Sequence, residues 1–260
     1  MFSKKGFVII CFVILSALLI TGCLPTTTVT TPEEYFTFDS ATGTITGYDI
    51  AGGLDVVIPS TIGGIGVEQI GDNAFYDKDL TSVIIPDSVT VIWAYAFYGN
   101  QLTSVTIPDS VTGIDDDAFA YNQLTSVTIP DSMTGFGDYA FANNQLTSVT
   151  IGNSVTGFGN YAFANNQLTS VTIPDSVTGF GYYAFANNQL TSVIIGNSVT
   201  GFGSAAFDDN GLTSVTIGAG VDISNDSTTM GTNTGFKAVY DGGGKLAGTY
   251  NYTGGVWVKA

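Results

Sequence analysis

The sequence predicts a β-rich repeat solenoid, because one 22-residue unit recurs at constant spacing through most of the chain. Residues 168–189 give this unit as LTSVTIPDSVTGFGYYAFANNQ. A leucine opens each copy, at Leu80, Leu102, Leu124, Leu146, Leu168, Leu190 and Leu212. A phenylalanine preceded by alanine has the same spacing, at Phe75, Phe97, Phe119, Phe141, Phe163, Phe185 and Phe207. A unit this short cannot bury its own apolar face, so neighbouring coils have to stack and share a continuous core.

Each copy begins with the pattern L-x-x-V-x-I, which is typical of a strand with one buried face. In one copy the inward residues are Leu124, Val127 and Ile129. The period of two then places Ser126 and Thr128 on the solvent side, and parallel stacking repeats that side every ~4.8 Å. The predicted result is a candidate binding face of hydroxyl side chains, made of Ser104, Thr106, Ser126, Thr128, Ser148, Thr150, Ser170 and Thr172.

The second half of each copy supplies the rest of the core and its turns. Position 18 carries a ring that we expect to be buried, at Phe97, Phe119, Phe141, Phe163, Phe185 and Phe207. Position 21 carries an amide, at Asn100, Asn122, Asn144, Asn166, Asn188 and Asn210. Amides stacked in register can bond from coil to coil while holding a turn, so we interpret this column as structural.

A column of tyrosines occupies position 16 of several copies, at Tyr95, Tyr139, Tyr161 and Tyr183. Because the Ala-Phe pair turns inward, we expect this column to lie partly exposed on the back of the coils. Two interpretations stay open. The rings pack on one another, or they form an aromatic strip that suits glycan or protein contacts.

The charge balance excludes several function classes. The net charge is −16, which opposes binding to a nucleic-acid backbone, and no cation lies between residues 79 and 236. The chain has no histidine, which removes Ser-His-Asp and Cys-His catalysis and histidine-ligated zinc. We interpret Asp115, Asp116 and Asp117 as a solvated charged turn, with calcium binding by the acidic turns left open. We therefore predict no enzyme activity, no catalytic residue, no metal site and no cofactor.

The N-terminus reads as an export signal over residues 1–22. Lys4 and Lys5 precede the 15 apolar residues 6–20, which is short for a membrane-spanning helix. The segment ends in Ile20-Thr21-Gly22-Cys23, which resembles the bacterial lipobox. That resemblance implies a lipid on Cys23 and, through it, attachment to the membrane of the bacterial cell envelope. The Thr- and Pro-rich residues up to 35 read as a tether between Cys23 and the folded part.

Caps are predicted at both ends of the repeat, because an open end exposes core and unpaired strand groups. Residues 36–53 form the N-terminal β cap, and residues 54–217 form the solenoid, whose first coil contains an extra Gly-Gly-Ile-Gly loop. Residues 218–260 form a C-terminal linker and a meander of three strands, FKAVY, LAGTY and VWVKA, joined by DGGGK and NYTGG. A separate binding module is the alternative interpretation of this last region.

The repeat motif from about residue 54 to 217 resembles the BspA-type, or treponemal-class, leucine-rich repeats of bacterial surface proteins. The resemblance implies a right-handed leucine-rich-repeat solenoid with parallel strands, elongated and curved, and exposed on the cell. It also implies attachment to host matrix proteins or to other cells. The chain differs from many family copies by having Asn-Asn-Gln after the Ala-Phe pair, where those copies carry a cysteine.

Three functional hypotheses follow. The first is a lipid-anchored surface protein that binds a macromolecule, either protein or glycan, without chemistry. The second is a structural coat without a specific ligand. Near-identical coils favour the coat, because a dedicated binding site breaks a repeat at a few positions. The third is ice binding through the Ser/Thr ladder, which Ile84 and Ile194 interrupt.

Overall fold

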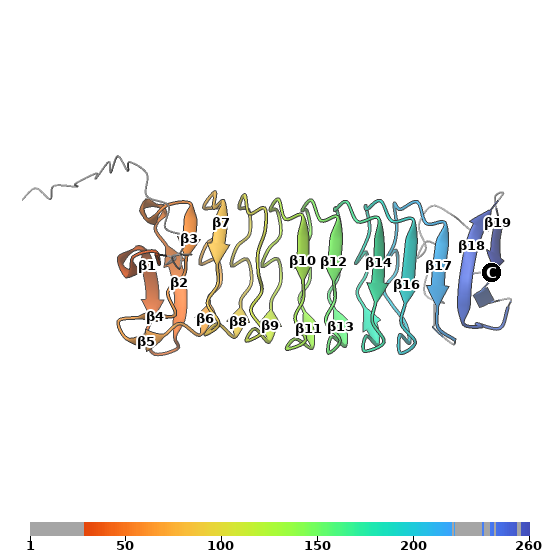
Figure 1. The fold of residues 1–260 in the computed structure, drawn as a ribbon, viewed down its shortest axis with the longest axis horizontal. Helices are drawn as coiled ribbons and strands as arrows, with labels where there is room; N and C mark the ends of the chain where they lie inside the picture. Colours follow the sequence, from red (N-terminus) through yellow and green to blue (C-terminus); the bar gives the residue numbers. More distant parts are fainter. Residues whose placement is uncertain (1–28, 220, 222–235, 237–239, 242, 254–255) are drawn as a thin grey trace, which may run out of the picture.

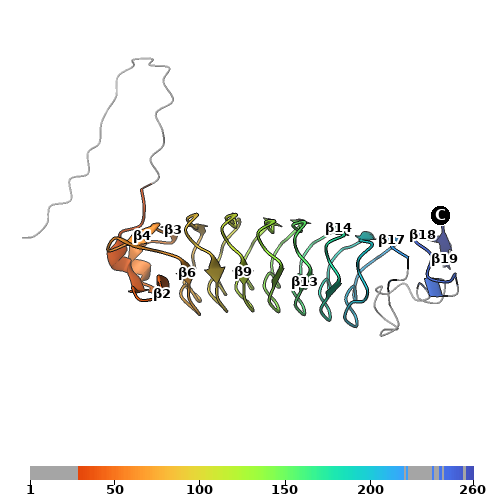
Figure 2. The same ribbon diagram turned by 90° about the horizontal axis from the view of Figure 1, so that it is seen from below.

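The computed structural model describes residues 29–219, 221, 236, 240–241, 243–253 and 256–260. The predicted signal peptide, Cys23 and much of the C-terminal linker lie outside these residues. The described chain forms a β-solenoid of about eight turns, stacked along one long axis (Figures 1 and 2). Within the described part, no helix has the length and apolar composition that a membrane crossing requires.

The first strand column follows the predicted L-x-x-V-x-I frame. It contains β3 (Asp55–Val57), β7 (Ser82–Ile84), β10 (Ser126–Thr128), β12 (Ser148–Thr150), β14 (Ser170–Ile173), β16 (Ser192–Ile195) and β17 (Ser214–Ile217). The pairs β3–β7, β10–β12, β14–β16 and β16–β17 are parallel. Ser126 is paired with Ser148, so the register equals the sequence period and identical residues stack.

A second column of two-residue strands lies at positions 12 and 13 of the coils. It contains β6 (Gln69–Ile70), β8 (Val91–Ile92), β9 (Gly113–Ile114), β11 (Gly135–Phe136), β13 (Gly157–Phe158) and β15 (Gly179–Phe180). These strands also pair in parallel, as β6–β8–β9 and as β11–β13–β15. Glycine is needed in the later coils, since a Cβ on Gly135, Gly157 or Gly179 would lie 2.8–2.9 Å from the carbonyl oxygen of the next glycine in the column.

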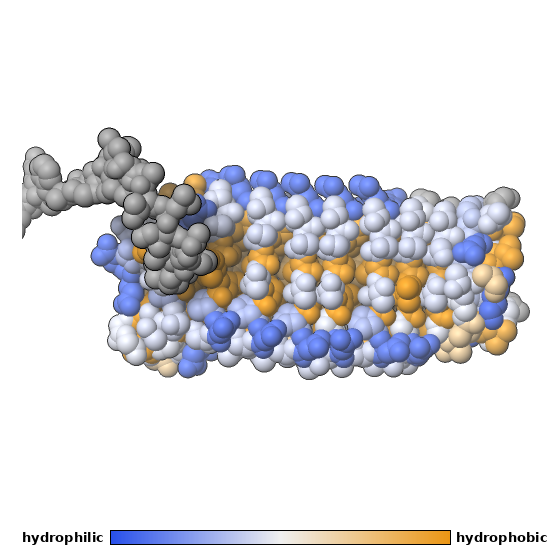
Figure 3. Space-filling model, viewed as in Figure 1, coloured by the Kyte–Doolittle hydropathy of each residue, from blue (hydrophilic) through white to orange (hydrophobic). Residues whose placement is uncertain are grey.

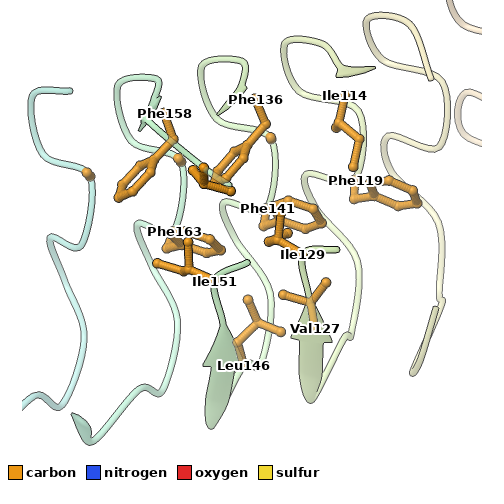
Figure 4. Packing of buried hydrophobic residues seen from close by; sticks show 14 of the residues in the cluster. Ile114, Phe119, Val127, Ile129, Phe136, Phe141, Leu146, Ile151, Phe158 and Phe163 are labelled. Carbon is orange, nitrogen blue, oxygen red and sulfur yellow. The ribbon is translucent and has the colours of Figure 1, made fainter. Parts of the chain in front are cut away.

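The core between the two columns is a stack of aromatic rings (Figure 4). The position-18 phenylalanines are fully buried, as predicted, and neighbouring ring centroids lie 5.0–5.7 Å apart. A second stack, Phe136, Phe158, Phe180 and Phe202, meets the first edge-on at 5.5–5.9 Å. Leu124, Val127 and Ile129 are buried against these rings, which confirms their predicted inward orientation.

The N-terminal cap is the expected hairpin, formed by the antiparallel strands β1 (Phe36–Asp39) and β2 (Thr44–Tyr48). β2 pairs in parallel with β6, so the cap continues the second strand column. Two short 3-10 helices flank it, η1 (Glu33–Tyr35) and η2 (Ile50–Gly52). The rings of Phe36 and Tyr48 cover Phe75 at 6.4 and 5.3 Å and so close this end of the core.

Contact with the solenoid begins inside the segment expected to be a tether. The amide of Thr31 donates to the Val57 carbonyl at 3.0 Å, and the Val57 amide donates to Thr31 Oγ1 at 3.0 Å. Thr31 therefore continues the strand-like pairing at the free side of β3. The extra loop of the first coil is a small hairpin, β4 (Thr61–Ile62) and β5 (Ile65–Gly66), with positive φ at Gly63 and Gly64.

The C-terminal cap differs in part from the predicted meander. In the segment FKAVY, which was predicted to be a strand, Phe236 and Tyr240 are helical, and the residues between them lie outside the described part. Phe236 and Tyr240 are both buried, and their ring centroids lie 5.9 Å apart. β18 (Gly248–Thr253) starts two residues after Leu246 and runs through residues predicted to be a turn. It pairs antiparallel with β17 and with β19 (Val256–Lys259), so the cap continues the first strand column.

The curvature implied by the family resemblance is not seen, since the rod is straight in both views (Figures 1 and 2). Solenoids curve when one side of each coil is wider than the other. Here the coils have short strands on both sides, and no helix occurs in the described coils between residues 54 and 217. Both sides therefore advance by a similar rise for each coil.

Candidate binding surfaces

The eight predicted hydroxyl residues form one exposed surface, which we call the Ser/Thr face. All eight are exposed. The parallel pair β10–β12 aligns Ser126 with Ser148 and Thr128 with Thr150, and β14–β16 aligns Ser170 with Ser192. Ser104 and Thr106 lie in a coil whose equivalent segment is not a strand. Ile84 and Ile194 take the threonine position in their own coils and are 49% and 48% exposed. One face of the molecule, seen in Figure 3, has near-neutral and apolar residues in the middle and hydrophilic rows along both long edges.

The hydroxyls of the Ser/Thr face are not used by the fold. Most hydroxyls of two other threonine columns are used, because they donate to a main-chain carbonyl of the preceding coil. Examples are Thr147 to Thr125 at 3.2 Å and Thr156 to Thr134 at 3.0 Å. Within the described residues, none of the eight hydroxyls of the Ser/Thr face bonds to another protein group. Each can therefore donate one hydrogen bond and accept two from a ligand.

A depression lies in the Ser/Thr face where the strand ladder changes partner. β10 and β12 form one sheet and β14, β16 and β17 belong to another, so the ladder is interrupted between β12 and β14. The space there is about 370 Å³ and is lined by residues that include Ser148, Thr150, Ser170, Thr172 and Asn153. Four of the predicted face residues thus surround one hollow.

The asparagine column is structural, as the sequence indicated. The side-chain oxygen of Asn144 accepts from the Leu124 amide at 3.0 Å. Its Nδ2 donates to the carbonyls of Phe119 at 3.0 Å and Phe141 at 3.2 Å. The bonds with Leu124 and Phe119 join groups about one solenoid turn apart, the bond to Phe141 is local, and none of the three goes to another amide of the column. Asn144 is buried, so the amide is turned away from solvent.

The predicted tyrosine strip is divided into two groups. Tyr139, Tyr161 and Tyr183 stack face to face at 4.6 and 4.9 Å, which agrees with packing on one another. Tyr95 belongs to a different cluster, because its ring lies 5.5 Å from Tyr98 and 6.4 Å from Tyr76.

The second cluster contains residues that the sequence interpretation missed. Tyr76 stacks on Tyr98 at 5.1 Å, and Tyr98 lies 5.0 Å from Tyr121. Tyr76, Tyr95 and Tyr121 are 42%, 39% and 52% exposed. The signal was available as departures from the repeat, since later copies carry Ala or Asn at positions 19 and 20 where Tyr98 and Tyr121 stand.

The three consecutive aspartates have different roles. Asp115 Oδ1 accepts from the Asp116 amide at 2.9 Å, and Asp116 Oδ1 accepts from the Asp138 amide of the next coil at 2.7 Å. Asp117 instead contacts the Tyr95 hydroxyl. The described residues contain no group of three or more His, Cys, Asp or Glu suited to holding a metal ion.

The pKa of the Asp117 carboxyl is raised above its ordinary value. Burial is the largest cause, the hydrogen bond from Tyr95 opposes it, and the charges of Asp116 and Asp138 add to it. The folded-state pKa thus exceeds the ordinary aspartate value of 3.8, and ionisation of Asp117 destabilises the folded chain.

We expect Asp117→Asn to raise the free energy of unfolding at neutral pH, because it removes this unfavourable charge. The gain should disappear as the pH falls through the folded-state pKa towards 3.8, where the native carboxyl is itself protonated. Urea unfolding of both proteins across this pH range measures the difference. A gain that does not change with pH would contradict the assignment.

Residues 68–191 and 112–233 match the family described as BspA type Leucine rich repeat region (6 copies). The chain belongs to the BspA-type leucine-rich repeat family. The match covers more than half of the sequence and agrees with the resemblance seen in its motifs. A search of curated protein sequences finds no match.

One solved structure supports the leucine-rich-repeat fold, and two others are similar to the chain more distantly. A leucine-rich repeat protein of T. pallidum superimposes with a TM-score of 0.58 at 28% identity, over 70% of this chain and 89% of that one. A leucine-rich repeat protein from Bacteroides ovatus gives 0.49 at 23%, over 70% and 63%. Pneumococcal vaccine antigen PcpA gives 0.48 at 18%, over 69% and 64%. The chain therefore spans less than two thirds of the length of the last two proteins.

Proposed function

We propose that this BspA-type protein is a non-catalytic, lipid-anchored protein of the bacterial surface that binds a macromolecule through its Ser/Thr face. The observation that carries the proposal is the set of eight exposed hydroxyls that have no hydrogen-bond partner among the described residues. The family, whose members are typically interaction proteins, supports a binding role. The export signal over residues 1–22 and the lipobox-like Cys23 support the anchor and the surface location.

The chemistry of the Ser/Thr face favours a polysaccharide as the ligand. Its hydroxyls both donate and accept hydrogen bonds, as sugar hydroxyls do. The eight residues include no Trp, Tyr or Arg, the residues that dominate binding energy in protein interfaces. A polymer lying along the rod meets the same pair of groups on each coil, so many weak contacts add up along its length.

We expect lysine at Thr128, Thr150 and Thr172 to abolish polysaccharide binding, because three charged side chains would cover the central hydroxyls. The full-length protein, purified in detergent, would be immobilised and tested against a panel of polysaccharides, matrix proteins and whole cells. The matched control places lysine at Gln123, Gln145 and Gln167, which are exposed and change the net charge by the same amount.

The outcomes separate the hypotheses. Saturable polysaccharide binding that the threonine variant loses and the glutamine variant keeps supports the proposal. Binding that both variants keep would place the site elsewhere on the rod. Saturable binding to a matrix protein alone would replace the ligand class, and the absence of binding to any member of the panel would favour the coat hypothesis.

A further inference from the structure

The coils of this chain are nearly identical, but they depart from the repeat at three neighbouring positions. From Leu124 onward, three successive copies carry Tyr at position 16, Ala at 19 and Asn at 20. The earlier copies replace these residues with Asp117, Tyr98 and Tyr121. In the fold the replacements meet, because Tyr98 lies 5.0 Å from Tyr121 and Asp117 contacts Tyr95, which packs on Tyr98. A repeat broken at residues that gather in one place marks a dedicated site.

Tyr121 occupies a backbone position that does not suit its side chain. Its φ is +56°, in the left-handed region, where the equivalent residues of the next three coils are Asn143, Asn165 and Asn187. Asn tolerates this region much better than a bulky aromatic residue. The Tyr121 ring is 52% exposed, so burial in the fold does not compensate for the unfavourable conformation. The ring is available to a partner.

Asp117 supplies a negative charge that no cationic side chain neutralises in the part of the chain that the structure describes. The carboxylates of Asp115 and Asp116 accept main-chain amides, whereas that of Asp117 is half-buried beside the Tyr95 hydroxyl. No Lys or Arg lies between residues 79 and 236, and the chain as a whole carries a net charge of −16. A half-buried carboxylate among exposed rings is complementary to a cation.

We propose that Asp117 with Tyr76, Tyr95, Tyr98 and Tyr121 forms a binding site for an arginine-bearing segment of a basic polypeptide. A guanidinium group suits this combination, since it stacks on aromatic faces and pairs with a carboxylate. The surrounding acidic rod would speed the approach of such a segment. The site is formed by repeat positions 16 to 20, in the second half of the coils, and does not include the Ser/Thr face.

The test measures binding of a fluorescent oligo-arginine peptide to the full-length protein in detergent by fluorescence anisotropy. The site variants are Asp117→Asn and Tyr121→Asn, both of which place a residue that tolerates positive φ. Their matched controls are Asp175→Asn and Tyr182→Asn, at positions where other coils carry Asn153 and Asn160. Each control makes the same chemical change outside the cluster, and circular dichroism checks that all four variants are folded.

We expect each site variant to weaken peptide binding about tenfold or more, and each control to change it less than about twofold. Equal losses in Asp117→Asn and Asp175→Asn would overturn the proposal, because they would show attraction by net charge alone. No binding by the parent protein would also overturn it. If an oligo-lysine peptide bound as tightly, the arginine assignment would be wrong. Polysaccharide binding lost only in the cluster variants would replace the cationic ligand with a glycan.

Discussion

Asn144→Ala is expected to lower the free energy of unfolding by ~3–5 kcal/mol. The substitution leaves the Leu124 amide without its acceptor and removes the donor to the carbonyls of Phe119 and Phe141. Each buried polar group left without a partner costs ~1–3 kcal/mol. Because the bonds with Leu124 and Phe119 join groups about one solenoid turn apart, the loss also weakens the coupling between neighbouring repeats.

Urea unfolding followed by circular dichroism measures this effect. The control is Asn153→Ala, since Asn153 is exposed and its side chain has no hydrogen bond to a protein group among the described residues. We expect the control to change stability by less than ~0.5 kcal/mol. Similar losses in both variants would show that the asparagine column does not hold the coils together.

The periodic part of the fold could be predicted because each position is repeated many times. A period of 22 fixes the strand register, so Ser126 had to pair with Ser148 once the coils stacked in parallel. The inward residues and the asparagine column follow from the same register. A single copy would leave the strand register and the inward residues ambiguous, but the agreement among several copies removes this ambiguity.

The non-periodic parts were harder to predict for physical reasons. FKAVY suits either a strand or a helical turn, and only the open end of the core decides that Phe236 and Tyr240 pack from a helix. Thr31 lies in a segment whose composition indicates a tether, yet its pairing with Val57 depends on a free strand edge that only the assembled fold provides.

The candidate sites show the same division. The exposure of the Ser/Thr face follows from the strand period, but the sequence does not show which hydroxyls are used by the fold. Thr125 and Thr128 read alike, and only the structure shows that Thr125 donates to the Thr103 carbonyl, at 3.5 Å. Tyr98 and Tyr121 stand at different repeat positions, 19 and 20, so only the fold shows that their rings lie 5.0 Å apart.

Phe141→Ala should lower the free energy of unfolding by ~3–5 kcal/mol, which is the usual cost of removing a buried ring. Phe141 is fully buried, and its ring lies 5.5 Å from Phe119 and 5.7 Å from Phe163. The edge of Phe136 also faces it at 5.9 Å. The stacked rings are fixed by coils on both sides, so the core cannot collapse to fill the space.

Chemical denaturation would measure the free energy of unfolding of Phe141→Ala, Phe141→Leu and Tyr182→Ala. The comparison separates the cost of a buried cavity from the cost of losing an aromatic ring at the surface. Leu fills much of the volume, so we expect its cost to be less than half that of Ala. Tyr182 is 56% exposed, and its removal should change stability by less than ~0.5 kcal/mol. A loss below ~1 kcal/mol in Phe141→Ala would mean that the ring stack does not couple the coils. In that case the hydrogen-bond ladder of the asparagines would be the main connection between repeats.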